Sequence, residues 1–199
     1  HDSSSSSSSN SSSRKSNSVE KREQYSGRSG GKGETDKTRF GRQPLHWAAR
    51  HGWADIVRYL VEEHSARVAV DARTKDGTTP FHLACYAGHL EVAKYLLSKG
   101  ADARTANSYG CDVTHWAAMG GDVATAKWLL DDLKLAFSSV QNDGHTPLHK
   151  AALKGQTRML AFLISHASIV ADSALLQQRD RSGATAVELM EAMRPGAKA

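Results

Sequence analysis

The stretch that decides the fold is TTPFHLACYAGHLEVAKYLL, residues 78–97. It contains His82, Cys85, His89 and Glu91, which are residue types that also bind zinc. A zinc site needs three or four such ligands in tetrahedral geometry. Whether these residues form a site or belong to a larger pattern depends on whether the same positions recur elsewhere in the chain.

They do recur. Segments with the same pattern begin with QPLHWAA at Gln43, TPFHLAC at Thr79, DVTHWAA at Asp112 and TPLHKAA at Thr146. A fifth, shorter unit, ATAVELMEAM, begins at Ala184. A fixed period of this length predicts stacked two-helix units that bury their apolar faces against their neighbours. A histidine found once per unit is therefore interpreted as structural: His46, His82, His115 and His149, at spacings of 36, 33 and 34 residues.

Each unit predicts a short helix, a glycine turn and a second helix with apolar residues at helical spacing. Proline opens the first helix in three of the units, where its fixed φ and missing N–H do no harm. Thr79 and Thr146 are the expected N-caps. The unit at Asp112 has no proline, so we expect its first helix to begin less sharply. Glycines end the first helices: Gly52, Gly88, Gly121 and Gly155.

These units resemble ankyrin repeats, whose pattern is T-P-L-H-x-A followed by two helices. The resemblance covers about 150 residues. It implies an all-α repeat solenoid, a helix–turn–helix stack with β-hairpin-like turns between repeats. The expected domain covers residues 38–199, with repeats at about 38–73, 74–107, 108–140 and 141–178 and a partial one at 180–195. The last unit is either a terminal cap or part of an array that continues.

Residues 1–37 predict a disordered tail, because they are rich in serine, glycine and charge and nearly lack apolar residues. The tail is either a linker or a phosphorylatable or basic segment. Residues 1–40 carry +3 of the net charge of +5, so the repeats are nearly balanced and nucleic-acid binding has weak support. Two cysteines favour a reducing compartment, and thus a cytoplasmic or nuclear location. No apolar run of about 18 residues predicts a membrane span.

The sequence predicts no catalytic, cofactor-binding or metal site, and thus neither an enzyme nor a small-molecule substrate. HExxH, CxxC, GxSxG and Walker-type motifs are all missing from the 199 residues. Letters alone do not exclude a Ser/His/Asp triad, but nothing in the sequence brings one together.

In the ankyrin family the partner lies along the concave face, formed by the hairpin tips and the exposed side of the first helices. Three aromatic residues there, Phe40, Tyr86 and Tyr109, are hot-spot types, although each could instead pack against its own repeat. Trp47 and Trp116 are expected in the core, and Trp53 as a local filler. The predicted contact residues are Arg39, Phe40, Arg42, Arg50, His51, Lys75, Asp76, Tyr86, Tyr109, Met119, Asn142, Asp143, His145 and Lys154.

Two connections are longer than the pattern requires, residues 62–75 and 165–182. Insertions in solenoids map to loops on one face, which is often a binding face, but long surface loops also arise at little cost. The predicted function is a protein–protein interaction module for an unidentified protein partner. The alternatives are a regulatory ankyrin region of a larger enzyme, channel or transferase, and nucleic-acid binding through the basic tail.

Overall fold

The structure is a computed structural model that describes residues 41–64, 68–166, 169 and 173–193. All of them belong to the second of two compact units, Thr35–Ala199. The serine-rich tail, Arg39 and Phe40 lie outside the described residues, so the predictions for them stay predictions.

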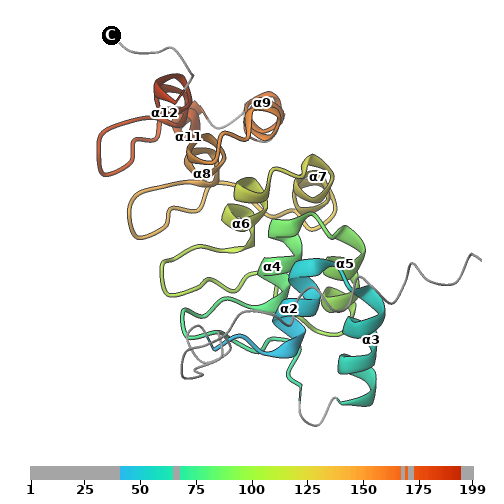
Figure 1. The fold of residues 1–199 in the computed structure, drawn as a ribbon. Coiled ribbons are helices and arrows are strands. Elements are labelled where there is room, and N and C mark those ends of the chain that lie inside the picture. The colour runs from blue at the N-terminus through green and yellow to red at the C-terminus, as the bar shows by residue number, and fades with distance from the viewer. Residues whose placement is uncertain (1–40, 65–67, 167–168, 170–172, 194–199) are drawn as a thin grey trace, which may run out of the picture. The chain divides into compact units, whose positions relative to one another are not determined.

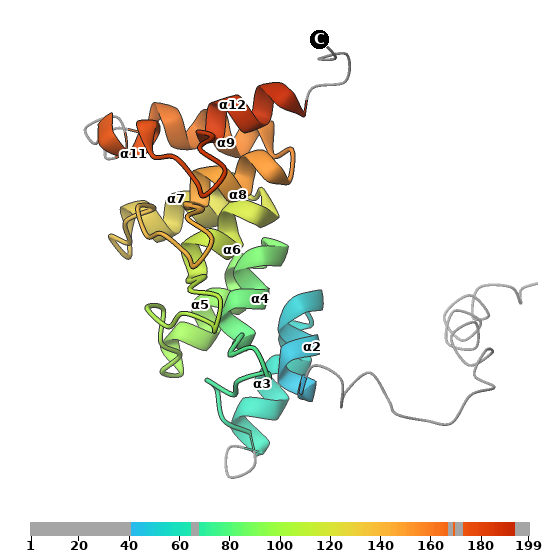
Figure 2. The ribbon, with the colours of Figure 1, turned by 90° about the vertical axis from the view of Figure 1, so that its left-hand side faces the viewer.

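The described residues form an all-α solenoid, as predicted, with no β-strand among them (Figure 1). The first helices of successive repeats pack on one another as an inner row, and Figure 2 shows them following one another from α2 to α12. The inner row comprises α2 (Pro44–His51), α4 (Pro80–Ala87), α6 (Val113–Gly120), α8 (Pro147–Leu153) and α12 (Ala186–Ala192). The outer row comprises α3 (Ala54–Glu63), α5 (Leu90–Ser98), α7 (Val123–Asp131) and α9 (Thr157–Ser165).

The inner helices begin where their sequences predict. Thr79 accepts a hydrogen bond from the backbone N–H of His82, and proline follows at the first helical position of α2, α4 and α8. The expectation of a less sharply formed α6 was wrong. Asp112 replaces the Thr-Pro pair there, and its carboxylate accepts the backbone N–H groups of Thr114 and His115. The resulting helix has 8 residues, as many as α2 and α4.

Small residues allow the inner helices to approach one another closely. The two consecutive small residues in the middle of α2, α4, α6 and α8 are 0–1% exposed, including Cys85, which takes an alanine position in α4. A Cβ atom on Gly120 would lie 2.0 Å from the backbone oxygen of Tyr86. Glycine at this position therefore permits the contact between the ends of α4 and α6.

The connection at residues 165–182 is more than a surface loop. It includes a further short helix, α11 (Ser173–Gln177). Ile169 and Leu175 are 2% and 8% exposed and belong to the same apolar core as Phe137, which is 1% exposed. In the part that the structure describes, this longer connection therefore covers the core beside α7.

The connections between repeats turn back at hairpin tips, which project to the left in Figure 1. The tips share one backbone pattern, shown by the N–H of Thr74 donating to Thr78 O at 3.0 Å and that of Gly77 to Thr74 O at 2.9 Å. Backbone bonds also join neighbouring tips: Ser108 N to Asp76 O at 2.8 Å, Asn142 N to Tyr109 O at 3.0 Å and Arg181 N to Asp143 O at 3.3 Å. The tips therefore form one hydrogen-bonded ladder.

Candidate functional site

The repeated histidines join each repeat to the next. Their Nε2 atoms face backbone oxygens of the segment that leads into the first helix of the following repeat: His46 to Thr78 at 3.2 Å, His82 to Thr105 at 3.0 Å, His115 to His145 at 3.1 Å and His149 to Ala184 at 3.1 Å. In three repeats Nδ1 accepts the N–H of the residue before the helix, from Gln43, Thr79 and Thr146. Nε2 must then carry the proton and donate it across the interface.

Burial keeps the rings of His46, His82 and His149 in the neutral form that this arrangement needs. It lowers the pKa of His46 and of His149 and lowers the pKa of His82 to about 4. At neutral pH each of these three rings thus carries one proton, on Nε2, and donates it in the hydrogen bond that joins one repeat to the next.

The third repeat uses a different arrangement. Nδ1 of His115 faces the Asp112 carboxylate at 2.9 Å, and the hydroxyls of Thr114 and Ser139 donate to the same carboxylate. Burial alone would raise the pKa of Asp112, but hydrogen bonds from His115, Ser139 and Thr114 lower it below its usual range. Because Ser139 bonds to the aspartate and not to the histidine, the cluster does not have the order of a Ser–His–Asp triad. It joins the third repeat to the connection that follows.

The residues that suggested zinc have other roles. Both ring nitrogens of His82 are already bonded to the protein. Cys85 is completely buried, and burial raises the pKa of its thiol, which opposes the thiolate form that a metal needs. His89 is the N-cap residue of α5. No group of three potential ligands with metal-binding geometry occurs within the described ranges.

The concave face, where the tips meet the inner helices, has a hollow of about 250 Å³. It brings together four of the predicted contact residues, Asp76, Tyr109, Met119 and Asp143. Tyr109 is 58% exposed. The hollow is also lined by residues that the sequence analysis did not select for contact: Asn107, Cys111, Trp116, Gln141 and Lys150.

A second hollow of about 310 Å³ lies between two tips and is lined by Lys75, Asp76, Ser108 and Tyr109. Some polar groups here also stabilise the tips. Hydroxyls of Thr74 and Thr78 donate to the Asp76 carboxylate, which lowers its pKa although burial opposes this. The tips are thus held in place by their own polar side chains and present a defined surface.

Aromatic and guanidinium groups form a row over α2 and α4. The rings of Trp47 and His51 are stacked at 6.2 Å, and those of His51 and Trp53 at 4.9 Å. The guanidinium of Arg42 lies 5.0 Å from the Trp47 ring centroid. Arg50 of α2 lies 4.5 Å from the ring centroid of Tyr86, which belongs to α4 of the adjoining repeat. We name this set the α2–α4 row: Arg42, Trp47, Arg50, His51, Trp53 and Tyr86.

The expectations for the tryptophans need correction. Trp47 and Trp116 are half-buried rather than core residues, whereas Leu83 at the same repeat position is 2% exposed. An indole is larger than a leucine side chain, so part of it extends beyond the space that leucine fills. Trp53 is 51% exposed and stacks on His51, so it does not fill a local gap. The repeat pattern does not predict how much of a tryptophan side chain is exposed at these positions.

Three further predicted contact residues, all of them described, line neither hollow and do not belong to the α2–α4 row. His145 is half-buried and its Nε2 lies 3.3 Å from Asp180. The Asn142 side chain donates to Ser108 O at 3.0 Å, so it also strengthens the ladder of tips. Lys154 is exposed just beyond the end of α8.

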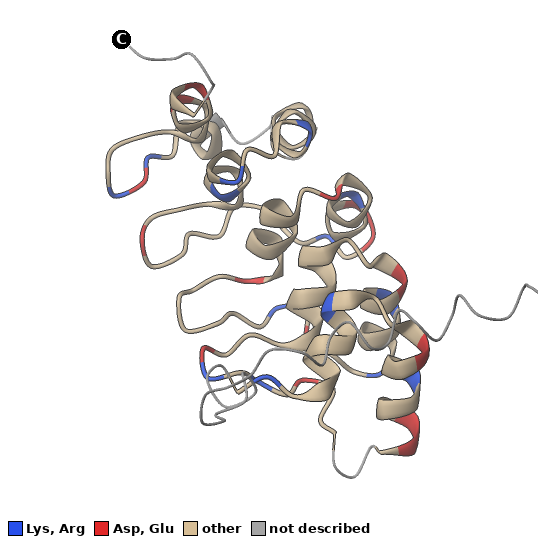
Figure 3. Ribbon diagram, viewed as in Figure 1, with Lys and Arg blue, Asp and Glu red and all other residues tan. Residues whose placement is uncertain are grey.

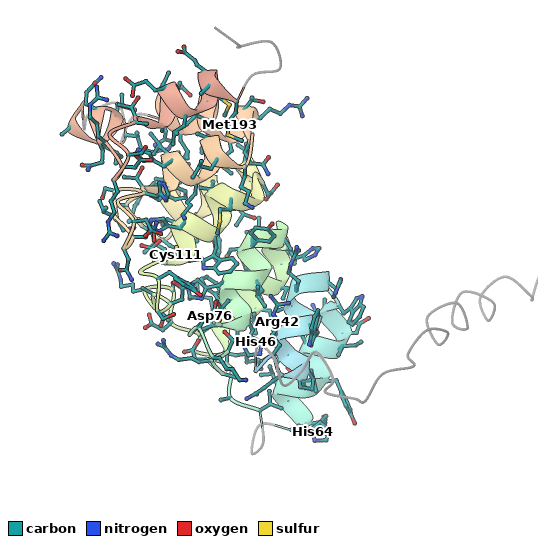
Figure 4. All side chains as sticks on the ribbon, turned by 60° about the vertical axis from the view of Figure 1, so that its left-hand side comes forward. Arg42, His46, His64, Asp76, Cys111 and Met193 are labelled. Atoms are coloured by element: carbon teal, nitrogen blue, oxygen red, sulfur yellow. The ribbon has the colours of Figure 1, made fainter. Side chains whose placement is uncertain are left out.

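Charge of both signs is interspersed over the helices and tips, as Figure 3 shows. No helix within the described ranges is both long and apolar enough to span a bilayer. Figure 4 shows Arg42, His46 and Asp76 near the start of α2, and both charges act on the His46 ring. The charged part of the concave face is therefore local rather than a continuous basic surface.

Comparison with known proteins agrees with this architecture. The family model for ankyrin repeats in three copies matches residues 22–107, 96–174 and 114–197. The chain is 31% identical over 124 residues to palmitoyltransferase AKR1 of Lachancea kluyveri. The aligned region covers 62% of this chain and 17% of that protein. The chain is also 30% identical over 126 residues to the nuclear factor NF-kappa-B p105 subunit of Mus musculus, covering 63% and 13%. The chain belongs to the ankyrin repeat family.

Proposed function

We propose that this chain is a non-enzymatic interaction module that binds a protein partner on its concave face. The observation that carries the proposal is the hollow of about 250 Å³ between the tips and the inner helices. Its walls include Tyr109, Trp116 and Met119, which are residue types enriched in protein interfaces. A protein side chain of ordinary size fits a space of this kind.

The concave face is held in one conformation before any partner arrives. Backbone bonds join successive tips, and histidine side chains join successive repeats. A partner therefore binds without having to order this surface, which lowers the entropic cost of association. Ankyrin repeats typically act in this way, through shape and side-chain complementarity rather than through chemistry.

The test is affinity capture with the full chain, compared between two tyrosine variants. Tyr109→Ala removes an exposed ring from the concave face, and Tyr59→Ala removes an equally exposed ring (57%) from the outer helix α3. A partner that is retained by the wild type and by Tyr59→Ala but lost by Tyr109→Ala supports the proposal. Equal recovery by both variants, with folding verified by circular dichroism, contradicts it.

A second candidate is a regulatory ankyrin region within a larger enzyme. The match to a palmitoyltransferase favours it, because the similarity covers only 17% of that protein. Sequencing the full-length transcript tests this candidate directly. An adjoining catalytic domain in the same reading frame would support it, and a transcript that encodes no such domain would exclude it.

A further inference from the structure

The α2–α4 row differs from the rest of the concave face in its charge. It contains two guanidinium groups and four rings, of which Trp53 is 51% exposed and His51 is also exposed. The charge of Asp76 in the first tip acts on His46 of α2, and its carboxylate already accepts hydroxyl groups from Thr74 and Thr78. This part of the surface is therefore cationic and aromatic.

Arg50 is the central group of the row. Its guanidinium stacks on Tyr86 at 4.5 Å, and it makes no ion pair or hydrogen bond to any described residue. Arg179 and Arg181, by contrast, pair with Glu188 and Asp143. A cation–π contact with a ring uses none of the guanidinium N–H groups as a hydrogen-bond donor, so these groups stay able to bind a carboxylate with two hydrogen bonds.

Stacking also reduces the cost of binding. An arginine held on an aromatic ring has already lost much of its side-chain freedom, so less is lost when a carboxylate arrives. Arg42 is held in the same way on Trp47 at 5.0 Å. Arg42 precedes α2 and Arg50 lies near the end of α2, so the positive charge of the row is spread along one helix, which suits an acidic ligand in an extended conformation.

We propose that the α2–α4 row binds an acidic, extended segment of a protein partner. A carboxylate side chain of the segment pairs with Arg50, the charge of Arg42 attracts the segment, and an apolar side chain packs on the exposed rings of His51 and Trp53. This inference rests on the proposed function, because it assigns a partner class to one part of the concave face.

A single-stranded nucleic acid would also favour cations and stacked rings. The adjoining hollow argues for a protein, because Asp76 and Asp143 line it and would repel the continuing phosphate backbone. A peptide places its charges only at chosen side chains and avoids this repulsion.

The experiment selects binders from a random dodecapeptide phage library on the full chain. Enriched peptides are then synthesised with fluorescein and titrated by fluorescence anisotropy at low and high salt. Arg50→Gln is compared with Arg58→Gln, a matched control that removes the same charge from the outer helix α3, where Arg58 pairs with Asp55 at 3.6 Å. Thermal unfolding verifies that both variants are folded.

We expect enriched peptides with net negative charge, affinity that falls with salt, and binding weakened about tenfold by Arg50→Gln but less than twofold by Arg58→Gln. Neutral or basic peptides, equal effects of the two variants, or failure to enrich any peptide overturn the inference. Displacement of the acidic peptides by an RNA oligonucleotide at comparable concentration also overturns it. Peptides that depend on Tyr109 but not on Arg50 overturn this inference alone, whereas peptides that depend on neither overturn the proposed function as well.

Discussion

Replacing Asp112 by alanine removes the polar centre of the third repeat. The carboxylate accepts the backbone N–H of Thr114 at 3.0 Å and of His115 at 3.3 Å, the His115 ring at 2.9 Å and two hydroxyls. Loss of a helix N-cap costs about 1 kcal/mol. Leaving a buried ring N–H and hydroxyls without their acceptor adds about 1–3 kcal/mol. We therefore expect Asp112→Ala to lower the free energy of unfolding by about 3 kcal/mol.

Urea unfolding followed by circular dichroism measures this loss. Thr146→Ala is the control, because Thr146 begins α8 at the same repeat position without a charge, and it should cost about 1 kcal/mol. The double variant Asp112→Thr with Val113→Pro restores the Thr-Pro start of α4 and α8 and should recover most of the stability. A loss below about 1 kcal/mol for Asp112→Ala, or no recovery in the double variant, would refute this account.

The same carboxylate predicts the sign of a pH dependence. Although burial acts in the opposite direction, hydrogen bonds from His115, Ser139 and Thr114 lower the pKa of Asp112 in the folded state. Its stabilising contribution is therefore complete above the unfolded pKa of about 3.9 and is lost as the pH falls below it. The stability difference between the wild type and Asp112→Asn should shrink towards acid. A difference that grows on acidification would contradict the assignment.

Two further predictions concern other joints of the stack. Burial lowers the pKa of His82 to about 4, so its contribution to the free energy of unfolding is complete above about pH 6.5. This contribution is lost as the pH falls towards 4, by on the order of 3 kcal/mol. His82→Gln should therefore show a smaller acid-induced decrease in the urea midpoint, and an unchanged decrease would exclude His82 as the cause. Gly120→Ala should lower the free energy of unfolding by about 3 kcal/mol, because the new Cβ would lie 2.0 Å from Tyr86 O. Gly155→Ala, at a position with φ +67° and no atom within 4 Å, should lower it by only about 1 kcal/mol. Equal melting temperatures for the two variants would refute the close-contact argument.

Repetition made the fold predictable. Each helix pair carries only weak local evidence, but the same proline, histidine and glycine recur in phase, so errors in one unit are corrected by the others. This was also the source of one error. The missing proline of the third repeat suggested a weak helix start, although aspartate is itself a strong N-cap and the carboxylate of Asp112 begins α6.

Features outside the repeat period were not predictable in the same way. Ile169 and Leu175 lie in a connection without a counterpart in other repeats, so no equivalent position shows that they pack near Phe137. The hollow likewise depends on side chains from three tips and two inner helices, including Lys150 and Gln141. The sequence identified several residues on its walls because the family pattern shows which positions face that side, but it contains no measure of the space between them.

Burial in a solenoid depends on the neighbouring repeat as much as on the residue. Val92 of α5 is 3% exposed, whereas Ile56 at the equivalent position of α3 is 46% exposed. Tyr95 of α5 donates to Glu62 of α3, the outer helix of the preceding repeat, while its counterpart Tyr59 is 57% exposed. The same reasoning applies to the α2–α4 row, where tryptophans at repeat positions remain partly open. A repeat pattern therefore predicts which residues can stack, and only the neighbour that packs there decides whether they form core or remain available as a binding surface.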